Sequence, residues 1–166
     1  QALDQFGETK LIFTKSNADT GGRIINKMIN DYVNNNNGRS IAFDSLGQLN
    51  YLSALKHVDM VVGNSSSGLI EAPSFKIPTI NIGDRQKGRI QAQTVISCNA
   101  VQKSIAEAIR KGFSNEFRDS IKDTINPYGD GKTSQRIKNK LKTVDINSDD
   151  PAHNLIRKEF YDIINI

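Results

Sequence analysis

A serine-rich turn near the middle of the chain carries residue types that could bind phosphate. An apolar run ending at Val62 is followed by Gly63, Asn64, three serines and Gly68, and then by the carboxylate of Glu71. This order predicts a strand, a loop of small residues and the first turns of a helix, whose unpaired N–H groups attract anions. The serine hydroxyls would add donors, and Gly68 would let a ligand approach the backbone. Such loops also cap helices for structural reasons alone, so both interpretations stay open here.

A second glycine-bearing loop, at residues 83–89, supplies positive charge. It contains Arg85 and Arg89, and a guanidinium group can hold phosphate oxygens with two parallel hydrogen bonds. The alternative is that these arginines pair with Asp84 or Glu71 at the surface.

Two further side chains complement these loops. Glu71 could accept hydrogen bonds from two vicinal ribose hydroxyls, and Asn17 offers an amide in an earlier polar loop, although it could also be a turn residue. The three loops, at 16–23, 63–68 and 83–89, each follow a predicted strand. Ligands of open α/β sheets bind beyond the carboxyl ends of the strands. The loops therefore predict a site for a nucleoside diphosphate.

Strand and helix signals alternate along the chain. Short apolar runs predict strands at 10–14, 40–43, 58–62, 79–82 and 94–97, and amphipathic spacing predicts helices at 23–34, 46–55, 100–111 and 134–144. Gly112 is the expected stop of the third of these helices. This alternation predicts an α/β fold, a three-layer Rossmann-like parallel sheet with helices on both faces.

The expected domain organisation has three parts. Residues 1–144 are expected to form a nucleotide-binding lobe, residues 145–151 a linker, and residues 152–166 a C-terminal helix that packs back towards another lobe. Residues 1–6 resemble the end of a helix, so the lobe is expected to be truncated at its amino end.

Composition excludes several classes of function. The chain has 166 residues, one cysteine and no apolar run long enough to span a bilayer, so we expect a soluble cytoplasmic protein with no membrane partner. The net charge is +4, but the basic run at 132–142 has no interleaved aromatic residues, which argues against nucleic acid. Cys98, His57 and His153 are too far apart in sequence to suggest a metal site. No cofactor is expected.

Two motifs closely resemble those of the hydrolysing UDP-N-acetylglucosamine 2-epimerases. The first runs from Gly63 to Pro73 and includes the serines and Glu71; the second runs from Pro78 to Arg89. The Asn17-x-Asp19 loop and the turn at 126–131 also match, and the resemblance extends to about Leu141.

This resemblance implies a fold and a set of binding residues. Enzymes of the family have two Rossmann-type lobes in the GT-B arrangement, and this chain is similar to the carboxyl-terminal, nucleotide-binding lobe. By motif position, Ser65 and Ser66 would hold the diphosphate, with Ser67 and Gly68 adjacent. Glu71 would bind the ribose, Arg85 would reach a phosphate, Asn17 would line the cleft, and the base would lie near residues 41–44.

The resemblance also implies a reaction. The family eliminates UDP across C1–C2 of the sugar and hydrates the resulting glycal, giving N-acetylmannosamine and UDP for sialic-acid synthesis. Its acid and base groups come from the amino-terminal lobe and from a histidine that neither His57 nor His153 matches. No catalytic residue is therefore expected in this chain, which should bind nucleotide weakly without turnover. The expected partners are a UDP-sugar, the missing amino-terminal lobe and further copies in a homo-oligomer.

Other interpretations remain open. The chain could be the donor lobe of a GT-B glycosyltransferase or a noncatalytic α/β nucleotide-binding module. The sugar could be a diacetamido-trideoxyhexose, and the base could belong to GDP.

Overall fold

The computed structural model describes residues 1–16 and 21–144, and the chain divides into two compact units at Tyr128 and Gly129. The linker predicted at 145–151 and the helix predicted at 152–166 lie outside the described residues. No helix in the described ranges is long and apolar enough to cross a membrane.

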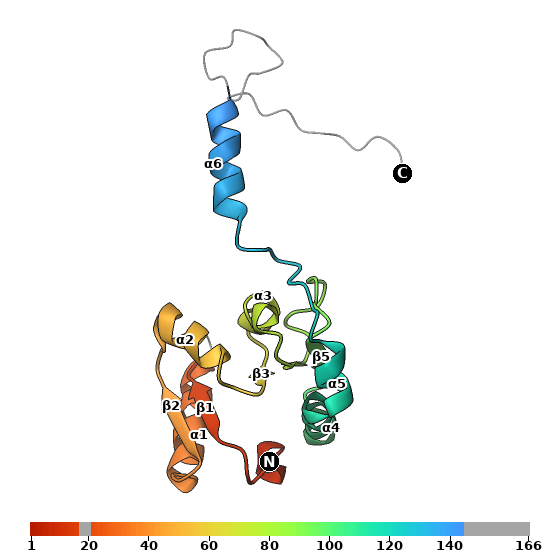
Figure 1. Cartoon of the computed structure of the whole chain (residues 1–166). Helices are drawn as coiled ribbons and strands as arrows, with labels where there is room; N and C mark the ends of the chain where they lie inside the picture. The colour runs from red at the N-terminus through yellow and green to blue at the C-terminus, as the bar shows by residue number, and fades with distance from the viewer. Residues whose placement is uncertain (17–20, 145–166) are drawn as a thin grey trace, which may run out of the picture. The chain divides into compact units, whose positions relative to one another are not determined.

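The larger unit contains five strands, and every pairing between them is parallel. They form a two-stranded sheet in the order β1-β2 and a three-stranded sheet in the order β3-β4-β5. In Figure 1, β1 and β2 lie on the left, and β3 and β5 of the other sheet lie to their right. The strands are β1 (Leu11–Thr14), β2 (Ser40–Phe43), β3 (Val61–Gly63), β4 (Thr79–Ile82) and β5 (Val95–Cys98).

The predicted strands match the observed ones except at β3, which begins three residues later than expected. The amides of His57 and Val58 both donate to the carbonyl of Ala54, so this apolar stretch still belongs to the turn that ends the preceding helix. Backbone already bonded in that turn cannot join the ladder with β4.

Helices separate the first four strands from one another, as predicted, whereas a loop without a helix joins β4 to β5. The α-helices of the larger unit are α1 (Gly22–Asn35), α2 (Gly47–Leu55), α3 (Ser67–Ile70), α4 (Gln102–Phe113) and α5 (Asn115–Ser120), and its 3₁₀ turns are η1 (Leu3–Gln5) and η2 (Ala72–Phe75). Ile80 of β4 packs against α4, whereas its neighbour Thr79 bonds the carbonyl of Gly68 in α3. Adjacent strand residues point to opposite faces. Helices therefore cover both faces of β4.

The prediction that Gly112 ends a helix is wrong, because α4 continues through it to Phe113. A Cβ atom at Gly112 would lie 2.5 Å from Cε of Met60 and 3.3 Å from Cβ of Pro78. The glycine is therefore required for close packing of α4 against the sheet and not for chain reversal.

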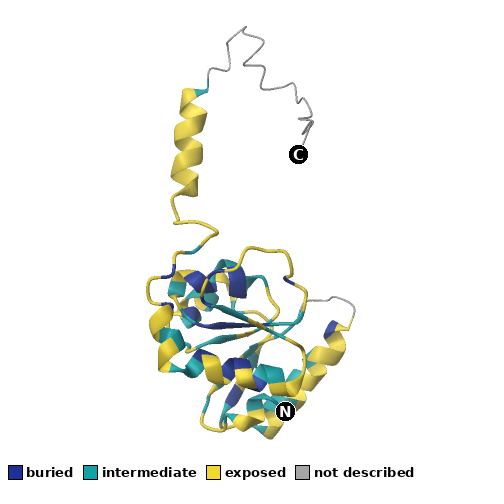
Figure 2. Ribbon diagram, turned by 90° about the vertical axis from the view of Figure 1, so that its right-hand side faces the viewer, coloured by how far each residue is buried: buried dark blue, intermediate teal, exposed yellow. Residues whose placement is uncertain are grey.

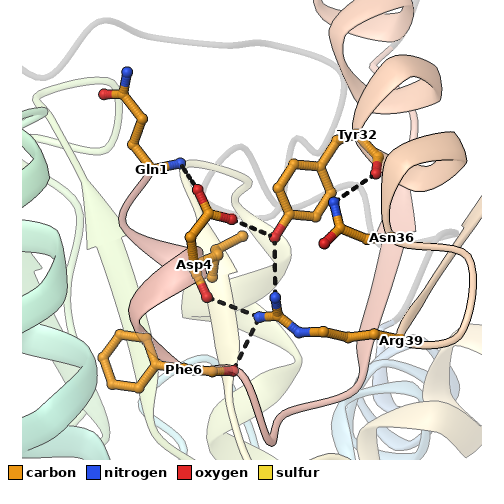
Figure 3. Close-up of polar contacts among 7 residues, drawn as sticks. Gln1, Asp4, Phe6, Tyr32, Asn36 and Arg39 are labelled. Carbon is orange, nitrogen blue, oxygen red and sulfur yellow. Dashed lines mark hydrogen bonds and ion pairs between the residues drawn. The ribbon is translucent and has the colours of Figure 1, made fainter.

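The residues at the amino end connect the two sheets. Nη2 of Arg39, just before β2, donates to the carbonyls of Leu3 at 2.7 Å and Phe6 at 2.9 Å (Figure 3). Tyr32 of α1 donates to Asp4 at 2.8 Å, while the Phe6 ring packs 6.2 Å from that of Phe113 in α4. The predicted helix end is thus the single turn η1, held by the β1-β2 sheet on one side and by α4 on the other.

The smaller unit contains the predicted basic helix, observed as α6 (Thr133–Thr143). Every residue of α6 is exposed (Figure 2). Arg136 pairs with Asp130 at 2.6 Å and lowers the pKa of that carboxyl group.

Candidate functional site

The serine loop, residues 64–68, leaves the carboxyl end of β3. Gly63 at the end of β3 is paired in register with Asn81 of β4, so the serine loop and the arginine loop, residues 83–89, leave neighbouring strands at one edge of the sheet. Gly83 has a φ of 73°, a conformation that side-chain-bearing residues rarely adopt, and it turns the chain out of β4. The prediction that these two loops leave the same edge is confirmed.

The helix after the serine loop is much shorter than expected. α3 has four residues, and Glu71 is the first residue after it, with its N–H bonded to the carbonyl of Ser67 at 2.9 Å. The chain then enters η2, where Pro73 has no N–H with which to continue an α-helix. One turn has only a small dipole. Any attraction for anions at this loop must therefore come mainly from side chains and free N–H groups.

The serines differ in their hydrogen bonds. Oγ of Ser65 accepts from the N–H of Ser67 at 3.3 Å, and Oγ of Ser67 is hydrogen-bonded to the hydroxyl of Tyr51. The N–H groups of Ser65 and Ser66 donate to no atom in the described part of the chain. These two amides and the serine hydroxyls are the donors that the loop can offer.

Gly68 is tied to the sheet. Its N–H is bonded to the carbonyl of Ser65, its carbonyl accepts from Oγ1 of Thr79 at 3.0 Å, and a Cβ atom would lie 2.7 Å from Cγ2 of Thr79. The sequence suggested that Gly68 lets a ligand approach the backbone. The structure shows instead that a glycine is needed because this residue packs against β4.

Glu71 has an oxygen without a partner. Its Oε2 atom is buried and accepts no hydrogen bond from any described residue. A buried carboxylate oxygen without a donor is costly. The structure thus leaves at Glu71 an acceptor that a ligand hydroxyl could satisfy.

The two arginines do not neutralise Glu71 or Asp84. The side chains of Arg85 and Arg89 are exposed and form neither an ion pair nor a hydrogen bond with a described residue. The alternative that they serve as surface ion-pair partners is therefore not supported, and both charges are available to a ligand.

Gln86 connects the arginine loop to the serine loop. Its side chain is buried, and Nε2 donates to the carbonyl of Asn64 at 2.8 Å. Sequence reasoning passed over this residue. The available signal was its position, as an amide between two charged residues of the motif.

Tyr51 was also missed. It lies on α2, is half-buried and bonds Ser67 through its hydroxyl. Burial is the main cause that raises its pKa above the ordinary value; the hydrogen bond with Ser67 acts in the opposite sense, and the Glu71 carboxylate raises the pKa further. The available signal was a tyrosine that precedes the predicted phosphate loop. The sequence of the α2 region does not indicate that this side chain is directed at the loop.

Asn126, in the turn at 126–131, is hydrogen-bonded to the carboxyl end of α3. Nδ2 of Asn126 donates to the carbonyl of Ile70 at 2.8 Å and to Oγ of Ser74 at 2.7 Å. Asn126 is partly buried, and it supports the site indirectly by holding the end of α3.

The first loop is described only at its ends. Asn17 lies outside the described residues, so its predicted place in the cleft stays a prediction. The side chain of Asn26 in α1 bonds both the N–H of Ser16, at 2.9 Å, and its carbonyl, at 3.1 Å. In the region expected near the base, Asp44 pairs with Lys15 at 2.7 Å.

Other features of the described residues carry no site chemistry. They contain no cluster of metal-ligating side chains. A hollow of about 280 Å³ lies between residues 91–93 and 123–127 and includes none of the predicted site residues. Burial raises the pKa of the free thiol of Cys98.

Comparison with known proteins identifies the family. GDP/UDP-N,N'-diacetylbacillosamine 2-epimerase (hydrolyzing) of Campylobacter jejuni is 44% identical over 116 residues, which are 70% of this chain and 30% of that protein. Polysialic acid biosynthesis protein P7 of Escherichia coli is 39% identical over 117 residues, 70% of this chain and 29% of that protein. The chain thus spans about a third of the length of the curated relatives it matches.

A solved structure shares the fold. The Methanocaldococcus jannaschii UDP-GlcNAc 2-epimerase, in complex with UDP-GlcNAc and UDP, matches 85% of this chain and 37% of its own chain with a TM-score of 0.65 at 19% identity. The family described as UDP-N-acetylglucosamine 2-epimerase matches residues 1–142, and this chain therefore belongs to that family.

Proposed function

We propose that this chain is the UDP-binding lobe of a hydrolysing UDP-N-acetylglucosamine 2-epimerase. The observation that carries the proposal is the arrangement at the carboxyl ends of β3 and β4. The serine loop supplies hydroxyl and amide donors, and Glu71 lies just beyond it. Neither the buried Glu71 oxygen nor the two guanidinium groups of the adjoining arginine loop have a partner among the described residues. These are the groups that a diphosphate and a ribose require.

Each predicted residue has a task in this proposal. The hydroxyls and free amides of Ser65 and Ser66 donate to the diphosphate, with Ser67 and Gly68 adjacent. Glu71 accepts hydrogen bonds from the ribose hydroxyls.

The charged and amide side chains complete the proposed site. Arg85 and Arg89 neutralise the phosphates, and Asn17 lines the cleft. The lobe thereby holds the leaving group and stabilises the negative charge that develops on it as the bond to the sugar breaks.

The proposed reaction has two balanced steps. A base removes the proton from C2 of the sugar while the C1–O bond breaks, which gives a glycal and UDP. Water then adds at C1 and a proton returns to C2 from the other face, which gives N-acetylmannosamine. The groups that move these protons are proposed to lie on another lobe of the enzyme.

Exposed apolar surface supports a partner lobe. On β1 and β2 the side chains of Ile12 and Ile41 are each half exposed, and Met28 of α1 is more exposed still. Apolar surface of this kind is usually covered by other protein. We propose that further polypeptide of the enzyme packs there, and that the enzyme is a cytoplasmic homo-oligomer.

A second candidate substrate follows from the relatives. The Campylobacter jejuni relative is named for N,N'-diacetylbacillosamine linked to GDP or UDP. A UDP-linked 2,4-diacetamido sugar is therefore the alternative to UDP-N-acetylglucosamine, and the same serine and arginine loops would hold its diphosphate.

Binding is tested by NMR titration of the chain with UDP up to millimolar concentration. The amide signals of Ser65 to Gly68 and of Arg85 should shift. Glu71→Ala should weaken the response by roughly tenfold or more, because hydrogen bonds to a charged group contribute about 1.5–3 kcal/mol.

Glu107→Ala is the matched control, since Glu107 is an exposed glutamate on α4 away from the loops. It should bind UDP like the wild type. Absence of any shift at the serine loop, or equal responses of the Glu71 and Glu107 variants, would contradict the proposed site.

Activity is tested with the protein that includes a partner lobe. Incubation with UDP-N-acetylglucosamine should release UDP and N-acetylmannosamine, and incorporation of deuterium from solvent at C2 would report the elimination step. Transfer of the sugar to an acceptor, with no free N-acetylmannosamine, would instead indicate a glycosyltransferase.

A further inference from the structure

The hydroxyl of Tyr51 makes a contact that the proposed function does not require. It reaches from α2, which follows the β1-β2 sheet, to Oγ of Ser67 in the loop that follows β3. Either oxygen could be the donor. The direction of this hydrogen bond determines whether Ser67 can offer a proton to a ligand.

The chemistry of the two hydroxyls favours the phenol as the donor. A phenol is a stronger acid than the aliphatic hydroxyl of a serine, and Ser67 is the one acceptor that the Tyr51 hydroxyl has among the described residues. If Tyr51 donates, the hydroxyl proton of Ser67 has no acceptor in the described structure and points away from the phenol oxygen. A serine in this state is a donor ready for an anion.

We propose that Tyr51 is a positioning residue whose hydroxyl donates to Ser67, so that Ser67 presents its own proton to a phosphate oxygen of the bound nucleotide. This inference rests on the proposed function and adds to it a residue that contacts no ligand through its hydroxyl. In the chain Tyr51–Ser67–phosphate each hydrogen bond polarises the next, which strengthens the terminal one. A hydroxyl already oriented in the free protein also loses less freedom on binding.

The arrangement explains why a tyrosine hydroxyl is directed at this loop. Among the described residues, no side chain is hydrogen-bonded to the hydroxyl of Ser65 or Ser66, whereas Tyr51 is bonded to that of Ser67. Ser67 should therefore contribute more to phosphate binding than its position at the inner end of the loop suggests.

The experiment is a double-mutant cycle measured by UDP titration with NMR detection. Tyr51→Phe keeps the ring and removes the hydroxyl, and we expect it to weaken UDP binding roughly three- to tenfold, the range of one hydrogen bond. Ser67→Ala should weaken binding by a similar factor. The double variant should bind no worse than the weaker single variant, because both changes remove the same chain of hydrogen bonds.

Tyr32→Phe is the matched control. Tyr32 also donates through its hydroxyl, but to Asp4 at the amino end of the chain. It should leave UDP affinity unchanged. Titration with uridine gives a second readout, since loss of the Tyr51 hydroxyl should not alter the response to a ligand without phosphate. A purely structural role of Tyr51 would weaken both ligands alike.

The outcomes separate the two proposals. A wild-type chain that does not respond to UDP overturns the proposed function and this inference with it. A wild-type response that Tyr51→Phe leaves unchanged, losses that multiply in the double variant, or equal losses for UDP and uridine overturn the role of Tyr51 alone.

Discussion

The two sheets of the larger unit differ in how much of their surface is covered. Ile80 of β4 is 0% exposed, between α4 on one face and α3 on the other, whereas Ile41 of β2 is 50% exposed. Parallel strands are normally covered on both faces. The serine and arginine loops leave the sheet whose central strand is buried, and the β1-β2 sheet carries apolar side chains that are half exposed.

The largest expected effect tests this difference with one substitution in each sheet. Ile80→Ala should lower the free energy of unfolding by about 2–5 kcal/mol, because it leaves a cavity between β4 and α4. Ile41→Ala should cost about 1 kcal/mol or less, since half of that side chain is already in water. Urea unfolding of the chain measures both.

Equal losses for the two variants would show that the β1-β2 sheet is covered as fully as β4. Repeating Ile41→Ala in the protein with its partner lobe sharpens the comparison. If the proposed partner packs on this sheet, the cost at Ile41 should rise there.

A smaller effect is expected from adding one methyl group beside each sheet, at Gly68 next to β4 and at Gly38 next to β2. Gly68→Ala should destabilise the chain by about 1–3 kcal/mol, because its Cβ atom would overlap Cγ2 of the buried Thr79. Gly38→Ala is the matched change beside β2, where a Cβ atom meets nothing within 4 Å. It should be neutral or slightly stabilising.

A second substitution identifies the cause. Thr79→Ser removes Cγ2 and keeps the hydroxyl that bonds the carbonyl of Gly68, so it should restore part of the stability of Gly68→Ala. Thermal unfolding that shows no such rescue would contradict the overlap as the origin of the loss.

The smallest effect concerns the two tyrosines that link parts of the larger unit. Glu71→Gln should lower the pKa of Tyr51 towards its ordinary value, because a carboxylate no longer opposes the phenolate charge. Asp4→Asn should do the same for Tyr32, whose pKa is raised by burial first and then by its bond to Asp4. NMR titration of the ring carbons measures both values.

The sign of the pH dependence follows from these shifts. A phenol whose pKa is raised in the folded state contributes stability below the ordinary value of 10.0, and that contribution is lost as the pH rises through the raised value. Each substitution should therefore reduce the loss of stability above about pH 10. A change in the pKa of the other tyrosine would mean that the two sites are coupled.

Much of the fold could be predicted because its signals are local. The alternation of short apolar runs with amphipathic spacing placed β1, β2, β4 and α1 close to their observed bounds. The predictions failed where contacts between segments distant in sequence determine the local structure. Gly112 reads as a helix stop, but the space beside Met60 and Pro78 requires a glycine inside α4.

The candidate site was predicted unevenly for a related reason. The residue types and spacing of the serines, Glu71 and the two arginines are enough to predict a phosphate and ribose site. Gln86 and Tyr51 are ordinary residues until Gln86 bonds Asn64 and Tyr51 bonds Ser67, and both contacts join segments that no sequence spacing relates.

The sequence by itself determined that the chain is α/β and that two adjoining loops, with Glu71 between them, could bind a nucleoside diphosphate. Hydrophobic period, glycine placement and the chemistry of side chains are properties of short segments, so they can be read without coordinates. The tertiary structure decided that α3 is a single turn, that Gly68 packs on Thr79, that Glu71 retains an oxygen without a partner and that Tyr51 reaches Ser67. Those facts depend on which segments pack against one another and how closely, and packing is settled only when the whole unit folds.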